Sequence, residues 1–200
     1  MSEPLSKAAR TRQFVIEQTA SIFNAKGYAG TSMKDLTQAT GLTKGSIYGN
    51  FKDKDEVALA AFDYNFNRVT KYIKNKILAT EDSIERLLVY PRVYRNFLRI
   101  DFLQTGCPLL NTSTEADDTH PRLREKAADA LAFWKKSIEN LVRRGMERGE
   151  IKDNTQPALM AIVLISLIEG AIMQAKVTGK ETDLKIAMAF LEKMIKDLRK

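Results

Sequence analysis

The spacing of apolar residues predicts a protein built almost entirely from α-helices. Along most of the chain the apolar positions recur every three or four residues, which is the period of an amphipathic helix. Alternating β-branched runs, which would indicate strands, are nearly absent. The predicted helices cover residues 7–26, 31–40, 43–50, 53–78, 83–99, 121–148, 158–177 and 182–198. Pro91 should kink or divide the fifth of these, so we expect an all-α fold of about nine helices.

Two short helices joined by a glycine turn are predicted over residues 31–51. Ser32 is placed to cap the first helix, with Asp35 as its capping-box partner. Gly41 suits the left-handed position that ends a helix, and Thr43 can cap the second helix. This is the pattern of a helix-turn-helix unit, whose second helix enters the major groove of DNA. An ordinary αα-hairpin is the alternative interpretation of the local pattern.

Charge and composition narrow the class of protein only modestly. The net charge of +7 favours a polyanionic partner, but residues 1–56 contribute only 8 Lys+Arg against 6 Asp+Glu. Cys107 is the single cysteine of the sequence, which excludes an intrachain disulfide. Because His120 is the single histidine, a zinc site is not expected either. We expect no metal, no cofactor and no signal peptide. We also expect no membrane span, because the apolar stretch 158–173 contains Glu169 and suits a buried helix. A cytoplasmic location follows as the expectation.

The polar residues around the glycine turn are the candidates for DNA contact. Thr43 and Lys44 would lie at the start of the second helix, where side chains reach base edges and phosphates. Gly45 leaves the approach to the duplex open, while Ile47 and Phe51 should face the core. The full candidate set is Thr31, Ser32, Thr43, Lys44, Gly45, Ser46, Tyr48, Asn50 and Lys54. For each of them, a solvated surface residue is the alternative.

The segments 15–28, 31–36 and 41–57 closely resemble the N-terminal domain of the TetR/AcrR family of bacterial repressors. Gly49 departs from that pattern, because the family more often carries a bulky or polar residue there. The resemblance implies a helix-turn-helix DNA-binding domain over residues 1–52 and a helical effector-binding and dimerisation domain over residues 53–200. It also implies that the last two helices pair with those of a second copy. The residues expected at that interface are Leu164, Ile168, Ile172, Phe190 and Met194. Packing of these helices against each other within one chain is the alternative.

An effector pocket is expected among the aromatic residues of the second domain. The candidates are Phe62, Phe66, Tyr90, Phe97, Phe102, Cys107, Trp134 and Glu169. Core packing is the alternative for each aromatic residue. Cys107 could be a sensor or a small buried residue, and Glu169 could face a pocket or a dimer contact.

These patterns together predict a homodimeric transcriptional repressor that leaves a palindromic operator when a small, largely apolar effector binds. A DNA-binding regulator without small-molecule control, or an activator, is the alternative. No nucleophile elbow, phosphate loop or metal-ligand spacing supports an enzyme.

Overall fold

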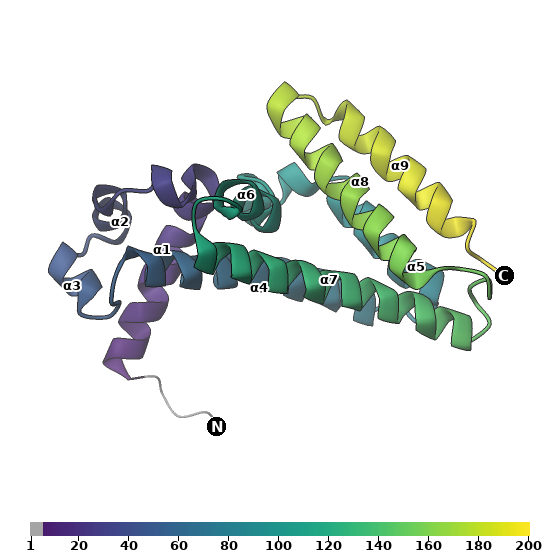
Figure 1. The fold of residues 1–200 in the computed structure, drawn as a ribbon, viewed down its shortest axis with the longest axis horizontal. Coiled ribbons are helices and arrows are strands. Elements are labelled where there is room, and N and C mark those ends of the chain that lie inside the picture. The colour runs from purple at the N-terminus through teal and green to yellow at the C-terminus, as the bar shows by residue number, and fades with distance from the viewer. Residues whose placement is uncertain (1–5) are drawn as a thin grey trace. The chain divides into compact units, whose positions relative to one another are not determined.

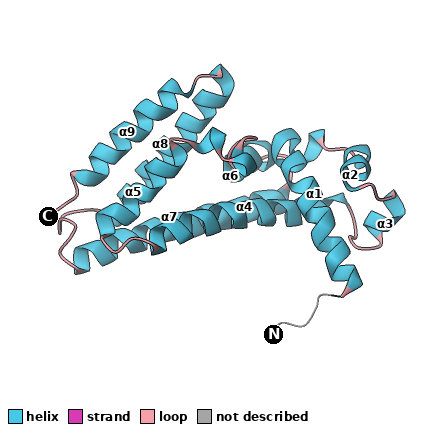
Figure 2. Ribbon diagram, turned by 180° about the vertical axis from the view of Figure 1, so that it is seen from behind, coloured by secondary structure: helices cyan, strands magenta, loops and turns pink. Residues whose placement is uncertain are grey.

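The computed structural model describes residues 6–200, and these residues are helical apart from turns and loops (Figures 1 and 2). They form nine α-helices and two short 3-10 helices, and an isolated bridge pairs Ile151 with Arg199. The α-helices are α1 (Lys7–Gly30), α2 (Met33–Thr40), α3 (Lys44–Tyr48), α4 (Lys54–Leu78), α5 (Ser83–Tyr94), α6 (Pro108–Ala116), α7 (Pro121–Glu147), α8 (Pro157–Thr178) and α9 (Glu181–Lys196). The 3-10 helices are η1 (Phe97–Arg99) and η2 (Asp101–Leu103). The predicted all-α class is confirmed.

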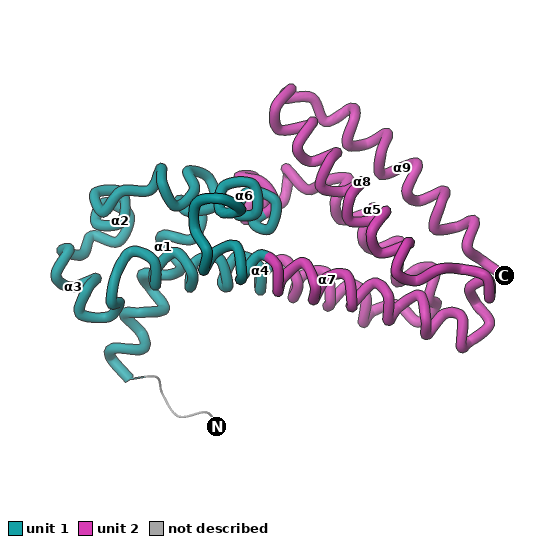
Figure 3. The backbone as a smooth tube through the Cα atoms, viewed as in Figure 1, with its two compact units in different colours: residues 1–68, 108–127 teal, residues 69–107, 128–200 magenta. Residues whose placement is uncertain are grey.

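The chain divides into two compact units (Figure 3). The first unit contains residues 1–68 and 108–127, and the second contains residues 69–107 and 128–200. The first half of α4, all of α6 and the start of α7 therefore belong to the same compact body as α1, α2 and α3. The division of roles expected at residue 52 concerns function, and it stays a proposal.

The first unit is held together by one apolar core. Leu36 of α2 and Ile47 of α3 are completely buried, and Phe51 closes the core behind α3. They meet side chains of α1 and α4 in a cluster comprising Val15, Ala20, Phe23, Leu36, Ile47, Phe51, Val57, Ala58 and Ala61. The faces of α2 and α3 that carry no core residue are thereby left at the surface.

The predicted caps of the short helices are present. The Ser32 hydroxyl accepts the N–H of Asp35 while the Asp35 carboxylate accepts the N–H of Ser32, which is a complete capping box. Gly41 has φ 67°, the left-handed conformation that ends α2. The Thr43 hydroxyl accepts the N–H of Ser46 at 3.1 Å and so begins α3. Local sequence therefore sets the geometry of this turn.

The structure adds to the predicted helices in three places. Helix α1 breaks at Gly27, with φ 71° and ψ −179°, where the predicted helix ends, and then resumes to Gly30. Helix α5 ends at Tyr94 rather than near residue 99, and two 3-10 turns follow. Helix α6 lies inside the segment predicted as an interruption, with Pro108 in its first turn. Its contacts with α1, described below, replace the stabilisation that its Thr- and Ser-rich sequence does not supply.

In the second unit, α9 packs along both α8 and α5 (Figure 1). Helix α8 is the one helix of the described chain that is long and apolar enough to cross a membrane by length and composition. In this chain 44% of its most apolar window is buried, including Leu164, Ile168 and Ile172. The interior of this unit therefore depends on α8.

Candidate functional site

The outer face of α3 presents a compact set of polar groups. Thr43 and Lys44 are exposed at the start of the helix, and Tyr48 lies one turn further on. The Lys44 ammonium is 5.7 Å from the centre of the Tyr48 ring, so both groups occupy the same face. Ile47 lies on the opposite face and fills the core. This face offers a cation, two hydroxyl groups and a helix N-terminus to whatever approaches it.

The two glycines of this region are not required by the fold. A Cβ atom on Gly45 would meet only the Thr43 hydroxyl oxygen, at 4.0 Å. A Cβ atom on Gly49 would meet the carbonyl oxygens of Gly45 and Ser46 at 3.4 and 3.6 Å, which is ordinary contact. Gly49 also has φ −70°, so neither space nor backbone conformation demands glycine there. A bare backbone at Gly45 is instead suited to close approach by another molecule.

The C-terminal end of α3 is secured from inside the unit. The Asn50 side-chain amide donates to the carbonyl of Ser46 at 2.9 Å, and Arg12 donates to the carbonyl of Asn50 at 2.8 Å. The Arg12 guanidinium also pairs with Glu56 at 2.7 Å and lies 4.2 Å above the Phe51 ring. Asn50 therefore serves the shape of α3 with its side chain. Ser46 contributes its backbone to the same end.

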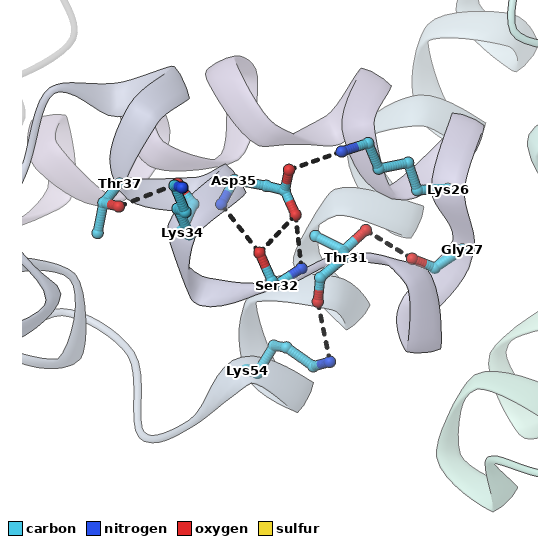
Figure 4. Close-up of polar contacts among 8 residues, drawn as sticks. All are labelled: Lys26, Gly27, Thr31, Ser32, Lys34, Asp35, Thr37 and Lys54. Atoms are coloured by element: carbon cyan, nitrogen blue, oxygen red, sulfur yellow. Dashed lines mark hydrogen bonds and ion pairs between the residues drawn. The ribbon is translucent and has the colours of Figure 1, made fainter.

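At the start of α2, the candidate residues Thr31 and Ser32 make different polar contacts (Figure 4). Ser32 is exposed and caps the helix, while Lys26 bonds Asp35 at 2.6 Å. The ammonium of Lys26 and the hydroxyl of Ser32 hold the pKa of Asp35 well below its usual range. Thr31, in contrast, is only 1% exposed, and its hydroxyl donates to the carbonyl of Gly27 at 2.6 Å. A DNA contact from the Thr31 side chain was the wrong expectation, because that side chain closes the break in α1.

Lys54, another candidate for DNA contact, is bonded to groups of its own unit. Its ammonium donates to the carbonyl oxygen of Tyr28 at 2.9 Å. It also donates to that of Thr31 at 3.0 Å (Figure 4). It also lies 4.0 Å from the centre of the Tyr28 ring, a cation–π arrangement. Lys54 therefore satisfies carbonyl groups left free where α1 ends, and its expected phosphate contact stays a prediction.

Tyr28, Asp55 and His120 form a polar cluster that joins α1, α4 and the start of α7. The Tyr28 hydroxyl donates to Asp55, which with burial raises the pKa of Tyr28 to about 12. The His120 ring meets the Tyr28 ring edge to face, with centres 4.5 Å apart. His120 Nδ1 accepts the N–H of Leu123, so in the neutral ring the proton lies on Nε2, 3.6 Å from Asp55 Oδ2. Sequence spacing gave no signal for this cluster.

Helix α6 is attached to the broken end of α1 by two side chains one turn apart. Glu115 accepts the N–H groups of Tyr28 at 2.8 Å and Ala29 at 2.9 Å. Asn111 donates to the carbonyl of Asn24 at 2.9 Å. The break at Gly27 exposes the N–H groups that Glu115 accepts, so α6 completes a helix end in the same unit as α2 and α3.

The expected pocket residues separate into groups. Tyr90, Phe97 and Trp134 lie together in the second unit, joined by Tyr94, which the sequence analysis missed. The Tyr94 ring centre is 5.3 Å from that of Phe97 and 5.8 Å from that of Trp134. Burial raises the pKa of both tyrosines above the usual value. This aromatic cluster is defined by Tyr90, Tyr94, Phe97 and Trp134.

A buried acid lies beside the aromatic cluster. The Cys107 thiol is 3.0 Å from Glu169 Oε1, and both residues influence the Tyr94 hydroxyl electrostatically. Burial raises the pKa of Glu169 to about 7, and the hydrogen bond from Cys107 opposes that rise. The expected proximity of Cys107, Glu169 and aromatic side chains is therefore found in the structure.

The remaining pocket candidates lie elsewhere. Phe102 packs edge to face on Tyr72, with ring centres 5.8 Å apart. Phe62 and Phe66 stack on each other in the first unit. Phe62 borders a small cavity there of about 20 Å³, room for roughly one water molecule. The expected pocket role of these three phenylalanines stays a prediction.

The interface candidates on α8 and α9 also separate. Leu164, Ile168 and Ile172 are completely buried within the single chain, so they are corrected from interface to core residues. Phe190 is 58% exposed, and Met194 is partly exposed. Other exposed apolar side chains of these helices are Leu159, Ile162, Met173, Val177 and Ile186. The positions on α8 recur at helical spacing and mark one outward face that the sequence alone did not separate from the inner one.

Comparisons with known proteins agree with this geometry. The family model "Bacterial regulatory proteins, tetR family" matches residues 15–61, and "Tetracyclin repressor-like, C-terminal domain" matches residues 83–191. A curated relative, the HTH-type transcriptional repressor DhaR of Mycobacterium sp. (strain GP1), is 28% identical over 84% of this chain and 85% of its own. A TetR-family regulator from Cytophaga hutchinsonii is similar in structure, with a TM-score of 0.91 and 43% identity over 98% of both chains. One from Chloroflexus aurantiacus J-10-FL has a TM-score of 0.92 and 36% identity over 98% of both chains. The chain therefore belongs to the TetR family of transcriptional regulators.

Proposed function

We propose that two copies of this chain bind a palindromic operator and repress transcription, with one α3 helix in each of two successive major grooves. The observation that carries the proposal is the outer face of α3, where Thr43, Lys44 and Tyr48 surround the bare backbone of Gly45. Dimeric helix-turn-helix proteins place such helices about 34–36 Å apart. Ser32, exposed at the start of α2, is proposed as a phosphate contact.

The proposed dimer forms through the outward face of α8 and α9. Contiguous exposed apolar side chains on a soluble protein indicate an interaction surface, and Val177, Ile186 and Phe190 are each more than half exposed. Gly170 lies among the exposed positions of α8, and a Cβ atom there would meet nothing within 4 Å. A second copy of the same helices can therefore approach this face closely. Members of the TetR family typically dimerise, which supports this choice of partner.

Release from the operator is proposed to follow binding of a small, largely apolar effector within residues 53–200. TetR-family regulators bind small-molecule effectors, and the aromatic cluster beside Glu169 is suited to such a ligand. The route to DNA is proposed to include α6, because Glu115 holds the N–H groups just after Gly27. Thr31 immediately precedes Ser32, the N-cap of α2. Its hydroxyl donates to the carbonyl of Gly27, at the same break in α1. A shift of α6 would therefore reach the helix-turn-helix through contacts within the first unit. We place this activity in the cytoplasm.

The test begins by selecting an operator from a random duplex library with the wild-type protein. Lys44→Ala and Tyr48→Ala are each expected to weaken binding to the selected operator at least about tenfold, because each removes a phosphate or base contact. Lys136→Ala, which removes an exposed cation of the second unit, is the matched control. Operator affinity unchanged in both α3 variants would overturn the proposed reading helix. If no tested ligand weakens operator binding, the alternative of a DNA-binding regulator without small-molecule control would be favoured.

A further inference from the structure

Glu169 is a buried acid with one oxygen left unsatisfied. Its Oε1 is 3.0 Å from the Cys107 thiol, a weak donor. Its Oε2 is buried and has no hydrogen-bond partner. An ionised carboxylate is expensive to bury without donors, so such a group in a folded protein requires an explanation. Its position in the most apolar helix of the chain makes that explanation more pressing.

No described residue of the chain forms an ion pair with Glu169. None of the ion pairs in the described part of the chain includes Glu169. Lys176 lies two turns further along α8, but its ammonium donates to the carbonyl of Thr105 at 2.6 Å. Burial lowers the pKa of Lys176 from its ordinary value. No described ion pair therefore compensates Glu169 when it is ionised, and its Oε2 is free to accept a hydrogen bond from a ligand.

The neighbouring side chains are suited to an organic cation. Tyr94 is 1% exposed and lies within electrostatic reach of both Cys107 and Glu169. Its ring stacks on Phe97 and approaches Trp134 at 5.8 Å. Aromatic faces attract cations and pack against aromatic or alkyl groups. An acid at the edge of an aromatic cluster therefore matches a ligand with a charged end and an apolar body.

We propose that the effector is an amine, whose protonated nitrogen binds Glu169 and whose apolar body packs on Tyr94 and its aromatic neighbours. The proposal rests on the proposed function, and it assigns the chemical class of the ligand. An ammonium group supplies both the donor that Oε2 lacks and a charge-assisted hydrogen bond. A carboxylate ligand would be repelled by Glu169, and a neutral alcohol would leave its charge unpaired. The raised pKa of Glu169 is the direction expected of an acid whose cation is supplied by a ligand.

The experiment compares three ligands that share a phenylethyl body and differ in the polar end, on the full chain. The probes are 2-phenylethylamine, 2-phenylethanol and 3-phenylpropionate, and binding is measured by thermal unfolding and by titration calorimetry. We expect the amine to raise the Tm with concentration, with the other two compounds binding at least about tenfold more weakly. Glu169→Gln keeps the side-chain shape and removes the charge, so it should weaken amine binding at least about tenfold. Glu139→Gln, which alters a partly buried acid paired with Arg143, should bind the amine as the wild type does.

Each outcome decides the proposal. Equal binding of amine and alcohol, amine binding retained in Glu169→Gln, or no binding of the amine would overturn it. Operator affinity measured on the same samples separates this result from the proposed function. If operator binding responds only to the alcohol or only to the acid, the protein is a ligand-responsive regulator whose effector is not an amine. Absence of any operator binding by the wild type would instead count against the proposed function.

Discussion

The carboxylate of Glu115 occupies the space that a Cβ atom on Gly27 would need. Gly27 also has φ 71°, a conformation that side-chain-bearing residues rarely adopt. Two separate reasons therefore fix glycine at this position: the backbone conformation and the acid that crosses it. The same acid accepts the N–H groups of Tyr28 and Ala29, so the break in α1 and the attachment of α6 are one structural feature.

Replacing this glycine should be more harmful than replacing another left-handed glycine. Gly27→Ala is expected to lower the free energy of unfolding by about 1–3 kcal/mol, from left-handed strain and displacement of Glu115. Gly149 has the same φ of 71° and nothing within 4 Å of an added Cβ, so Gly149→Ala measures the strain alone. Urea unfolding of the two variants gives the difference. Equal losses would contradict a steric role for Glu115.

The two glycines of the α3 region should respond differently to alanine. Gly45→Ala adds a methyl group at the N-terminal end of α3, which is the end proposed to approach the bases, so operator affinity should fall about tenfold. Gly49→Ala lies at the far end and should stabilise the helix by about 0.5–1 kcal/mol with little change in operator affinity. Fluorescence anisotropy with labelled operator and thermal unfolding test both variants. A larger affinity loss from Gly49→Ala would reverse the proposed orientation of α3.

Lys54 should behave as a structural residue. Lys54→Met removes the ammonium that bonds the carbonyls of Tyr28 and Thr31, and stability should fall by about 1.5–3 kcal/mol. A phosphate-binding lysine would instead change the salt dependence of operator binding, by a slope of about one. Unfolding and salt titrations on the same variant distinguish the two roles. An unchanged stability with a reduced salt slope would restore the phosphate contact.

Glu169 should make stability depend on pH. Its pKa is about 7 in the folded chain against an ordinary 4.5, because burial favours the neutral acid. A raised pKa stabilises the fold fully below pH 4.5, and this stabilisation is lost as the pH rises through 7, by about 3 kcal/mol. Glu169→Gln should therefore gain stability over the wild type as the pH rises from 5 to 8.5. Subtracting the wild-type stability from that of Glu169→Gln removes the contribution of other titrating groups. The exceptions are neighbours that respond to the charge of Glu169, namely the Cys107 thiol, Tyr94 and Lys176. A difference independent of pH would show that Glu169 is ionised throughout.

The exposed face of α8 and α9 should control oligomeric state. Phe190→Glu places a charge at the centre of the proposed interface, and sedimentation should show a shift from dimer to monomer. Phe133 is similarly exposed, at 56%, on α7, so Phe133→Glu is the matched control. A monomeric wild type, or a dimer that survives Phe190→Glu, would exclude this interface.

Sequence patterns predicted the elements that local chemistry determines. The Ser32–Asp35 capping box, the left-handed Gly41 and the Thr43 cap each depend on residues within a few positions, and all are present. The apolar period likewise placed Ile47 and Phe51 in the core. Features that depend on distant partners were missed. Helix α6 owes its attachment to Asn24 and to the N–H groups after Gly27, and neither contact is visible in its own sequence.

The same distinction applies to the candidate sites. Thr31 and Lys54 have the residue types of DNA contacts, but their partners across the unit engage them. The period of α8 identified an apolar helix without separating its inner face, with Ile168, from its outer face, with Val177. Tyr94 was not predicted because the rings of Phe97 and Trp134 reach it only in the folded chain.

The attachment of Glu115 to the end of α1 has a consequence for engineering hybrid regulators. A chimera that joins one regulator's first 52 residues to another's remaining chain would take Gly27 and Glu115 from different parents. The residue at position 115 would then accept the N–H groups of residues 28 and 29 only if the two parents happened to match there. A transplant that also carries residues 108–127 with the DNA-reading helices keeps both partners from one parent. The useful unit of exchange in this protein is therefore discontinuous in sequence.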